Sequence, residues 1–158
     1  MQDVDGLYDI LSDPIAMTHY PQTYNRDETI DWIKRSEQRF EDHGHGFLSC
    51  YLKETGEFTG ICGLLRQVDW GHGRDENEVG YLFRRKFWKQ GLATEAAVRC
   101  RQWGYEEFGY RRIVSLINPG NEPSIRVAKR NGMQFEQLIP AEKCKHKEDI
   151  QVWVVNIV

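Results

Sequence analysis

The chain has 158 residues, of which 40% are hydrophobic and 28% are charged, and its formal net charge is −3 at pH 7. This length and composition suit a single domain over residues 1–158 with a core of useful size. The mildly acidic charge argues against a nucleic-acid-binding protein, which needs a strongly basic face, and no apolar run approaches the roughly 20 residues of a membrane span.

The first part of the chain predicts two helices joined by an apolar connector. Residues 3–13 form a helical pattern that ends before Pro14. The connector, residues 15–24, is too apolar for a freely solvated loop and is consistent with a simple cap on the core. The second helix covers about residues 26–42, with Asn25 as its N-cap.

Three strands and a long helix follow. Residues 46–53 and 58–68 predict two strands, because the turn Glu54-Thr55-Gly56-Glu57 between them suits a hairpin. A third strand is expected at 77–83. After a short basic linker, a helix runs to about Phe108, and small residues recur along it at a spacing that favours close packing on a sheet.

The last part of the chain predicts a buried strand, a helix and a closing hairpin. The strand covers 112–118, and the helix begins at its cap Asn121 and ends at Gly132. Two further strands are expected at 133–139 and 150–158. Strands that alternate with helices before a closing hairpin predict an α/β fold with a sheet of mixed direction.

Cysteine and histidine positions argue against a metal site. The four cysteines are scattered without a Cys-x-x-Cys pair, and the five histidines lack clustered ligand partners. Zinc and a disulfide framework are therefore disfavoured, and a reducing compartment is favoured. No signal peptide opens the chain, so we expect a cytoplasmic protein that holds no metal.

The connection between the third strand and the long helix is a candidate anion site. The first N–H groups of a helix have no internal partner, and the helix dipole favours negative charge there. A basic cluster precedes this helix, consisting of Arg84, Arg85, Lys86 and Lys89. These features favour a phosphate or pyrophosphate, although an ordinary connection with solvated charges explains them equally well.

Two motifs extend this interpretation. The hexad Trp88-Lys89-Gln90-Gly91-Leu92-Ala93 resembles the acyl-CoA signature of the GCN5-related N-acetyltransferases (GNAT), usually Gln/Arg-x-x-Gly-x-Gly/Ala, with Trp at the first position. Gly80-Tyr81 before it, Thr94-Glu95-Ala96 after it and a second block over 121–133 resemble the ribosomal-protein alanine acetyltransferase (RimJ/RimL-like) branch. Two ordered motifs at the right separation make the resemblance specific.

The resemblance implies a fold and a co-substrate. The fold is a mixed, mostly antiparallel sheet, splayed beside the third strand and flanked by about four helices. Members usually begin with a strand, whereas this chain opens in a predicted helix, so either that strand is lacking or the start lies upstream. Acetyl-CoA would be bound mainly by backbone groups, the pantetheine arm near the third strand and the pyrophosphate at the helix start. The implied cofactor-binding residues are Leu82, Phe83, Lys89, Gln90, Gly91, Leu92, Ala93, Thr94 and Asn121.

Two side chains are implied in catalysis. An alkylamine must lose a proton before it attacks a thioester, and Glu78 is the best-placed carboxylate to accept that proton; the alternative is a solvated surface Glu. Many members place a tyrosine at the position of Ala128, and Ser124 would instead hydrogen-bond the leaving thiolate. Ser124 and Asn121 are equally consistent with roles in the helix end alone. A backbone N–H near Leu82 would polarise the carbonyl.

We therefore expect an acetyl-CoA-dependent N-acetyltransferase that transfers the acetyl group directly to a primary amine. The acceptor is a protein N-terminal α-amine, as on a ribosomal protein, or a small amine, and the connector 15–24 is a candidate wall of its site. The alternative is a catalytically inactive CoA-binding regulatory or interaction domain. A monomer and a homodimer are both compatible with the resemblance.

Overall fold

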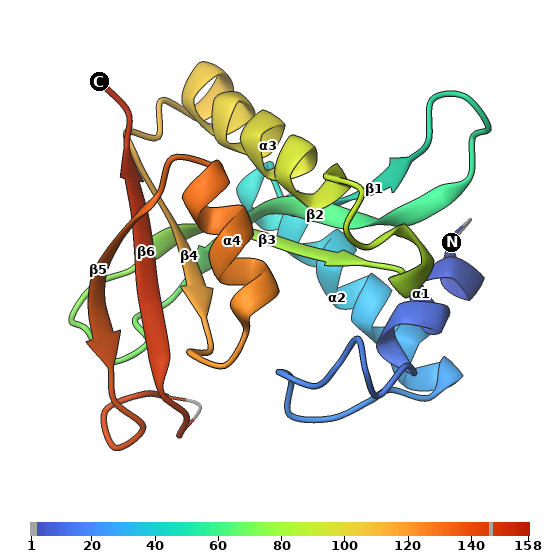
Figure 1. Cartoon of the computed structure of the whole chain (residues 1–158), viewed down its shortest axis with the longest axis horizontal. Coiled ribbons are helices and arrows are strands. Elements are labelled where there is room, and N and C mark those ends of the chain that lie inside the picture. Colours follow the sequence, from blue (N-terminus) through green and yellow to red (C-terminus); the bar gives the residue numbers. More distant parts are fainter. Residues whose placement is uncertain (1–2, 146) are drawn as a thin grey trace.

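The computed structural model describes residues 3–145 and 147–158. Within them, six strands form one sheet in the order β1-β2-β3-β4-β6-β5, and only the β3–β4 pair is parallel (Figure 1). The strands are β1 (Phe47–Tyr51), β2 (Phe58–Gln67), β3 (Glu76–Phe83), β4 (Arg112–Ile117), β5 (Gln134–Ile139) and β6 (Ile150–Asn156). The helices are α1 (Val4–Leu11), α2 (Arg26–His43), α3 (Leu92–Phe108) and α4 (Glu122–Arg130), with a short 3₁₀ turn η1 (Arg85–Phe87) after β3.

The helices cover the two faces of the sheet. Val79 of β3 packs in the cluster that holds α3 and α4, whereas Leu82 packs in the cluster formed by α1, the connector and β2. Neighbouring residues of a strand point to opposite faces, which explains this division. Gly104 lets α3 approach closely, since a Cβ there would lie 3.0 Å from Ile113 Cδ1. The predicted packing of small residues is therefore confirmed.

The sheet splays between β3 and β4. β2 and β3 pair along eight residues each, but the β3–β4 ladder has one registered pair, Glu78 with Val114. Beyond that pair, the hydroxyl of Ser115 donates to the Val79 carbonyl (3.0 Å), and the Leu116 N–H donates to Glu78 Oε1 (3.3 Å). Hydrogen bonds from or to these two side chains thus replace the next backbone hydrogen bonds of the β3–β4 ladder. We use the word splay for the region between the C-terminal half of β3 and the end of β4.

Candidate active site at the splay

The start of α3 has the geometry of an anion cradle. Lys89 and Gly91 both have left-handed backbones, with φ of 63° and 86°, and backbones of this kind turn N–H groups into a concavity. No side chain caps the helix, and its first backbone bond runs from the Glu95 N–H to the Gly91 carbonyl (3.0 Å). A Cβ on Gly91 would meet nothing within 4 Å, so the space above the helix start is open. The N–H groups without an intrahelical partner are those of Leu92, Ala93 and Thr94.

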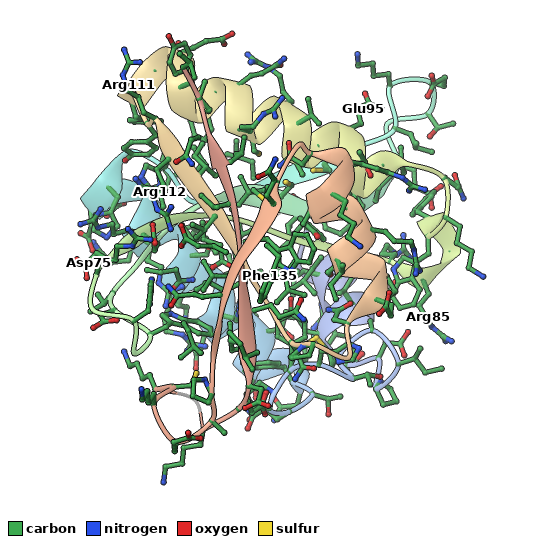
Figure 2. All side chains as sticks on the ribbon, turned by 60° about the vertical axis from the view of Figure 1, so that its left-hand side comes forward. Asp75, Arg85, Glu95, Arg111, Arg112 and Phe135 are labelled. Carbon is green, nitrogen blue, oxygen red and sulfur yellow. The ribbon has the colours of Figure 1, made fainter. Side chains whose placement is uncertain are left out.

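The basic cluster before α3 is engaged in ion pairs. Arg85 projects toward the α1 side, at the opposite end of the molecule from Arg112 and Asp75 (Figure 2). Among the described residues, Lys89 has no ion pair, whereas the other three cations each have at least one. The pairs are Arg84–Asp9 (2.5 Å), Arg84–Glu57 (3.5 Å), Arg85–Asp13 (2.5 Å) and Lys86–Glu57. These side chains therefore fasten the linker to α1 and the β1–β2 turn, and the cradle itself is made of backbone.

The phase of strand pairing decides which backbone groups of β3 face the splay. The Arg84 N–H donates to the Thr59 carbonyl (2.9 Å), and antiparallel pairs alternate along the strand. Leu82 therefore directs its N–H and C=O toward β2. Tyr81 and Phe83 direct theirs toward the splay. The backbone groups expected near Leu82 are consequently those of its two neighbours.

The first residue of the hexad closes the turn between β3 and α3. The Trp88 indole N–H donates to the Phe83 carbonyl (2.7 Å), and the Gln90 side chain donates to the Lys86 carbonyl (3.0 Å). Of the Phe83 backbone groups that face the splay, the carbonyl is thus occupied by Trp88. Trp88 departs from the motif at its first position, and no local pattern in the sequence indicates this role.

Glu78 stands where the β3–β4 ladder ends. Its carboxylate is half-buried and accepts from the Gln67 amide (2.5 Å) and from the Leu116 N–H (3.3 Å). Burial raises the pKa of Glu78 to about 7, although both hydrogen bonds act to lower it. A carboxylate with a pKa near neutrality is suited to accept and release a proton.

A chain of hydrogen bonds orients Glu78. The Trp70 indole N–H donates to Gln67 Oε1 (3.2 Å), and the Gln67 amide nitrogen donates onward to Glu78 Oε2. Neither Trp70 nor Gln67 was predicted, because no local pattern connects them with a residue of the next strand.

The apolar connector reaches the same region. Tyr20 lies near Glu78: burial chiefly, and then the charge of Glu78, raise the pKa of its phenol. The ring is nevertheless 42% exposed, as expected for a side chain that lines an open site. His19 approaches the turn between β4 and α4, with its Cε1 3.6 Å from where a Cβ on Gly120 would lie.

The start of α4 completes the site. Asn121 caps the helix by accepting from the Ser124 N–H (3.2 Å), and the Tyr81 hydroxyl donates to the Ser124 carbonyl (3.2 Å). Ser124 is half-buried, and its own hydroxyl has no hydrogen-bond partner among the described residues. Ala128, one turn further on, is buried in the core cluster. The structure thus brings Tyr81 and Ser124 together.

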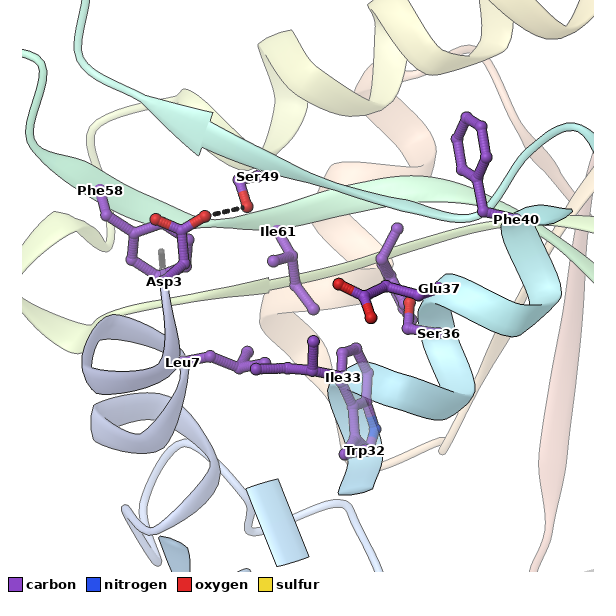
Figure 3. A pocket seen from close by; sticks show the side chains of 11 residues that line it. Asp3, Leu7, Trp32, Ile33, Ser36, Glu37, Phe40, Ser49, Phe58 and Ile61 are labelled. Atoms are coloured by element: carbon purple, nitrogen blue, oxygen red, sulfur yellow. Dashed lines mark hydrogen bonds between the residues drawn. The ribbon is translucent and has the colours of Figure 1, made fainter. Parts of the chain in front are cut away.

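A separate hollow lies between α1, α2 and the β1–β2 pair (Figure 3). It has a volume of about 200 Å³ and is lined by apolar side chains such as Leu7 and Ile33, with Ser49 donating to Asp3 (2.7 Å) at one end. None of the predicted site residues lines it.

The described residues offer neither a metal site nor a membrane-spanning helix. No group of three or more His, Cys, Asp or Glu side chains is arranged to hold a metal ion. None of the described helices is both long and apolar enough to cross a membrane.

The comparison with known proteins identifies the family. The family model described as acetyltransferase (GNAT) domain matches residues 1–134. The chain belongs to the GNAT family. It is 34% identical to "Uncharacterized protein YkkB" of Bacillus subtilis (strain 168) over 82% of this chain and 74% of that protein. It is 29% identical to "Uncharacterized N-acetyltransferase p20" of Bacillus licheniformis over 88% of this chain and 78% of that protein.

Solved structures of GNAT proteins share the fold. An acetyltransferase from Agrobacterium tumefaciens str. C58 superposes with a TM-score of 0.82 at 29% identity, covering 99% of this chain and 86% of that one. RimL, the ribosomal L7/L12 alpha-N-protein acetyltransferase, superposes in its CoA complex with a TM-score of 0.79 at 16% identity, covering 99% and 89%. This GNAT protein is an N-acetyltransferase, and the predicted fold class is confirmed.

Proposed function

We propose that this GNAT protein transfers the acetyl group of acetyl-CoA directly to a primary amine at the splay. The observation that carries the proposal is the position of Glu78, a half-buried carboxylate with a pKa of about 7 at the end of the β3–β4 ladder. The anion cradle at the start of α3 opens from the C-terminal end of the same strand. One strand therefore connects a candidate base with a candidate phosphate site.

The residues present fit acetyl-CoA. The open space above Gly91 and the free N–H groups of Leu92, Ala93 and Thr94 suit the pyrophosphate. The backbone of Tyr81 and the N–H of Phe83 suit the pantetheine arm and the thioester carbonyl, in place of Leu82. Acetyl-CoA supplies an acyl group on a thiol that can leave. The further assignments of Lys89, Gln90 and Asn121 to cofactor binding stay predictions.

Glu78 accepts the proton of the attacking amine in this proposal. A protein α-amine has a reference pKa of about 8 and a lysine about 10.4, and each unit of mismatch with the base costs about 1.4 kcal/mol. Glu78 therefore matches an α-amine better than a lysine-like amine. Two proteins of the same fold act on different amines by name, RimL on a protein α-amine and a spermidine N-acetyltransferase from Vibrio cholerae on a polyamine.

The acceptor is proposed to enter past the connector. Tyr20 and His19 lie on that route, and we propose that they discriminate between a peptide N-terminus and a small amine. We also propose that residues 1–158 act as one domain in the cytoplasm, as a monomer or homodimer. The four cysteines are free thiols, which is consistent with a reducing compartment.

Ligand-dependent unfolding and turnover test the proposal together. Acetyl-CoA at 100 times its dissociation constant should stabilise the protein by about 2.7 kcal/mol, and CoA should do so similarly, whereas ATP at the same concentration should not. Turnover with N-terminal peptides or small amines should then fall roughly 10²–10⁴-fold in Glu78→Gln. No stabilisation by acetyl-CoA would refute the cofactor assignment.

A second candidate function is CoA binding without catalysis, and Ala128 is the observation that favours it. Its small side chain offers no proton donor at the position where many relatives carry tyrosine. Stabilisation by CoA with no turnover on any amine of the panel would establish this alternative.

A further inference from the structure

We propose that Tyr81 donates a hydrogen bond to the sulfur of the departing thiolate. This inference rests on the proposed acetyl transfer and adds a catalytic residue to it. The structure brings the phenol of Tyr81 from β3 across to the first turn of α4, where its hydroxyl donates to the Ser124 carbonyl at 3.2 Å.

Tyr81 presents both its backbone polar groups and its phenol close to the splay. Its backbone N–H and C=O face the splay, because the pairing phase turns those of Leu82 toward β2. Its side chain leaves the strand on the face that holds α3 and α4. A thioester that lies along the splay beside β3 would therefore pass the phenol as it approaches α4.

Packing holds the Tyr81 ring in this place. The ring packs against the cluster that contains Ala128 and Ile125, and Cys62 stands directly opposite Tyr81 on β2. The hydroxyl is thus carried by a side chain with buried neighbours at its base and a single hydrogen-bond acceptor at its tip.

The phenol is suited to donate a hydrogen bond without losing its proton. Burial raises its pKa above the ordinary value of 10, whereas a thiol has a reference pKa of about 8.5. Full transfer of the phenolic proton to sulfur is therefore uphill. A donor that points at developing negative charge stabilises it all the same.

Bonds, electrons and protons are all accounted for in the acetyl-transfer step. The C–N bond forms as the C–S bond breaks, the bonding electron pair stays on sulfur, and the amine proton passes to Glu78. The Tyr81 O–H turns from the Ser124 carbonyl to the sulfur. Glu78 later returns its proton to water, and the thiolate takes one from water.

The pKa of the CoA thiol in the protein complex tests this role. The ultraviolet absorbance of the bound thiolate is followed against pH in wild type, Tyr81→Phe, Ser124→Ala and Tyr105→Phe. Tyr105 is the matched control, since its ring is exposed on α3. The thiol pKa should rise in Tyr81→Phe alone, and its kcat should fall about 10²-fold while CoA still stabilises the variant.

Three outcomes would overturn the inference. The first is an unchanged thiol pKa in Tyr81→Phe, and the second is a rise confined to Ser124→Ala, which would make that hydroxyl the donor. The third outcome applies if Tyr81→Phe does not fold, in which case a crystal structure of the wild-type CoA complex is the test. A CoA sulfur outside hydrogen-bonding distance of the Tyr81 hydroxyl would then overturn the inference. Failure of the acetyl-transfer proposal is recognised separately, because wild type would then not be stabilised by CoA.

Discussion

Gln67 and Glu78 lie diagonally across the antiparallel pair of β2 and β3, and the Gln67 amide donates to the Glu78 carboxylate at 2.5 Å. Diagonal neighbours of this kind are within reach of long side chains on the same face of a sheet. The contact fixes the carboxylate at the end of the β3–β4 ladder. It also opposes the rise in the Glu78 pKa that burial causes.

Removal of this hydrogen bond should shift the pH dependence of activity. In Gln67→Leu the ionised form of Glu78 loses a donor, so its pKa should rise above about 7. The acidic limb of the profile of kcat/KM against pH should then move to higher pH, while the plateau changes less. Gln102→Leu, an exposed position on α3, is the control. A limb that stays in place would show that Glu78 does not set the profile.

Glu78 should affect activity and stability in opposite directions. Activity of wild type should rise with pH through about 7, because only the ionised form accepts a proton. Folding raises the Glu78 pKa from 4.5 to about 7, so wild type should lose stability over that pH interval. Glu78→Gln should therefore lose activity roughly 10²–10⁴-fold, yet be more stable than wild type by about 3 kcal/mol near pH 8 and by much less near pH 5. Urea unfolding at the two pH values measures the difference; equal gains at both would contradict the role of ionisation.

Gly91 should be required for acetyl-CoA binding rather than for folding. Gly91→Ala places a Cβ in the open cradle and strains a left-handed backbone by roughly 1–2 kcal/mol. Gly56→Ala is a matched control, because Gly56 also has a positive φ and open space around it but lies in the β1–β2 turn. Both variants should lose similar stability without ligand, and only Gly91→Ala should lose stabilisation by acetyl-CoA. Equal stabilisation of the two variants by acetyl-CoA would show that the cradle does not bind this ligand.

Arg112 should hold the far end of the sheet together. Its guanidinium binds Glu76, which is 3% exposed, at 2.8 Å. Burial works to raise the Glu76 pKa, but Arg112 outweighs it and the pKa lies below its usual value. Glu76 would keep Arg74, whose Nε lies 2.9 Å from Oε1, so Arg112→Met should destabilise the protein by about 2 kcal/mol at neutral pH. Arg111→Met, at the exposed preceding residue that Figure 2 also labels, should have little effect.

The dependence of the free energy of unfolding on pH in the acid range gives a second test of the role of Arg112. A carboxylate with a lowered pKa contributes stability above its unfolded pKa and loses it as the pH falls through its folded pKa. The stability of wild type should thus fall more steeply in acid than that of Arg112→Met. Urea unfolding across the acid range would contradict the prediction if the two curves ran parallel.

Local patterns predicted the elements, and pairing in three dimensions determined the rest of the site. The alternation around Glu78 and the glycine at position 91 are local signals, and they indicated the strand and the helix start. Whether Leu82 or its neighbours face the splay depends on the strand register, and a one-residue shift would reverse the answer. Asp9, the partner of Arg84, lies 75 residues away in sequence, and Glu57, the partner of Lys86, lies 29 residues away. Both separations are beyond any periodic signal.

The carboxylate of Glu78 also helps to separate β3 from β4. It accepts the Leu116 N–H, which in a continued parallel ladder would donate to the Val79 carbonyl, and Ser115 occupies that carbonyl instead. The side chain proposed to handle the proton therefore also helps to set where the two halves of the sheet part. A change of Glu78 that removes its side-chain oxygens alters acid–base chemistry and strand separation at once. Ser115→Ala changes only the second, and so separates the architecture of the site from its chemistry.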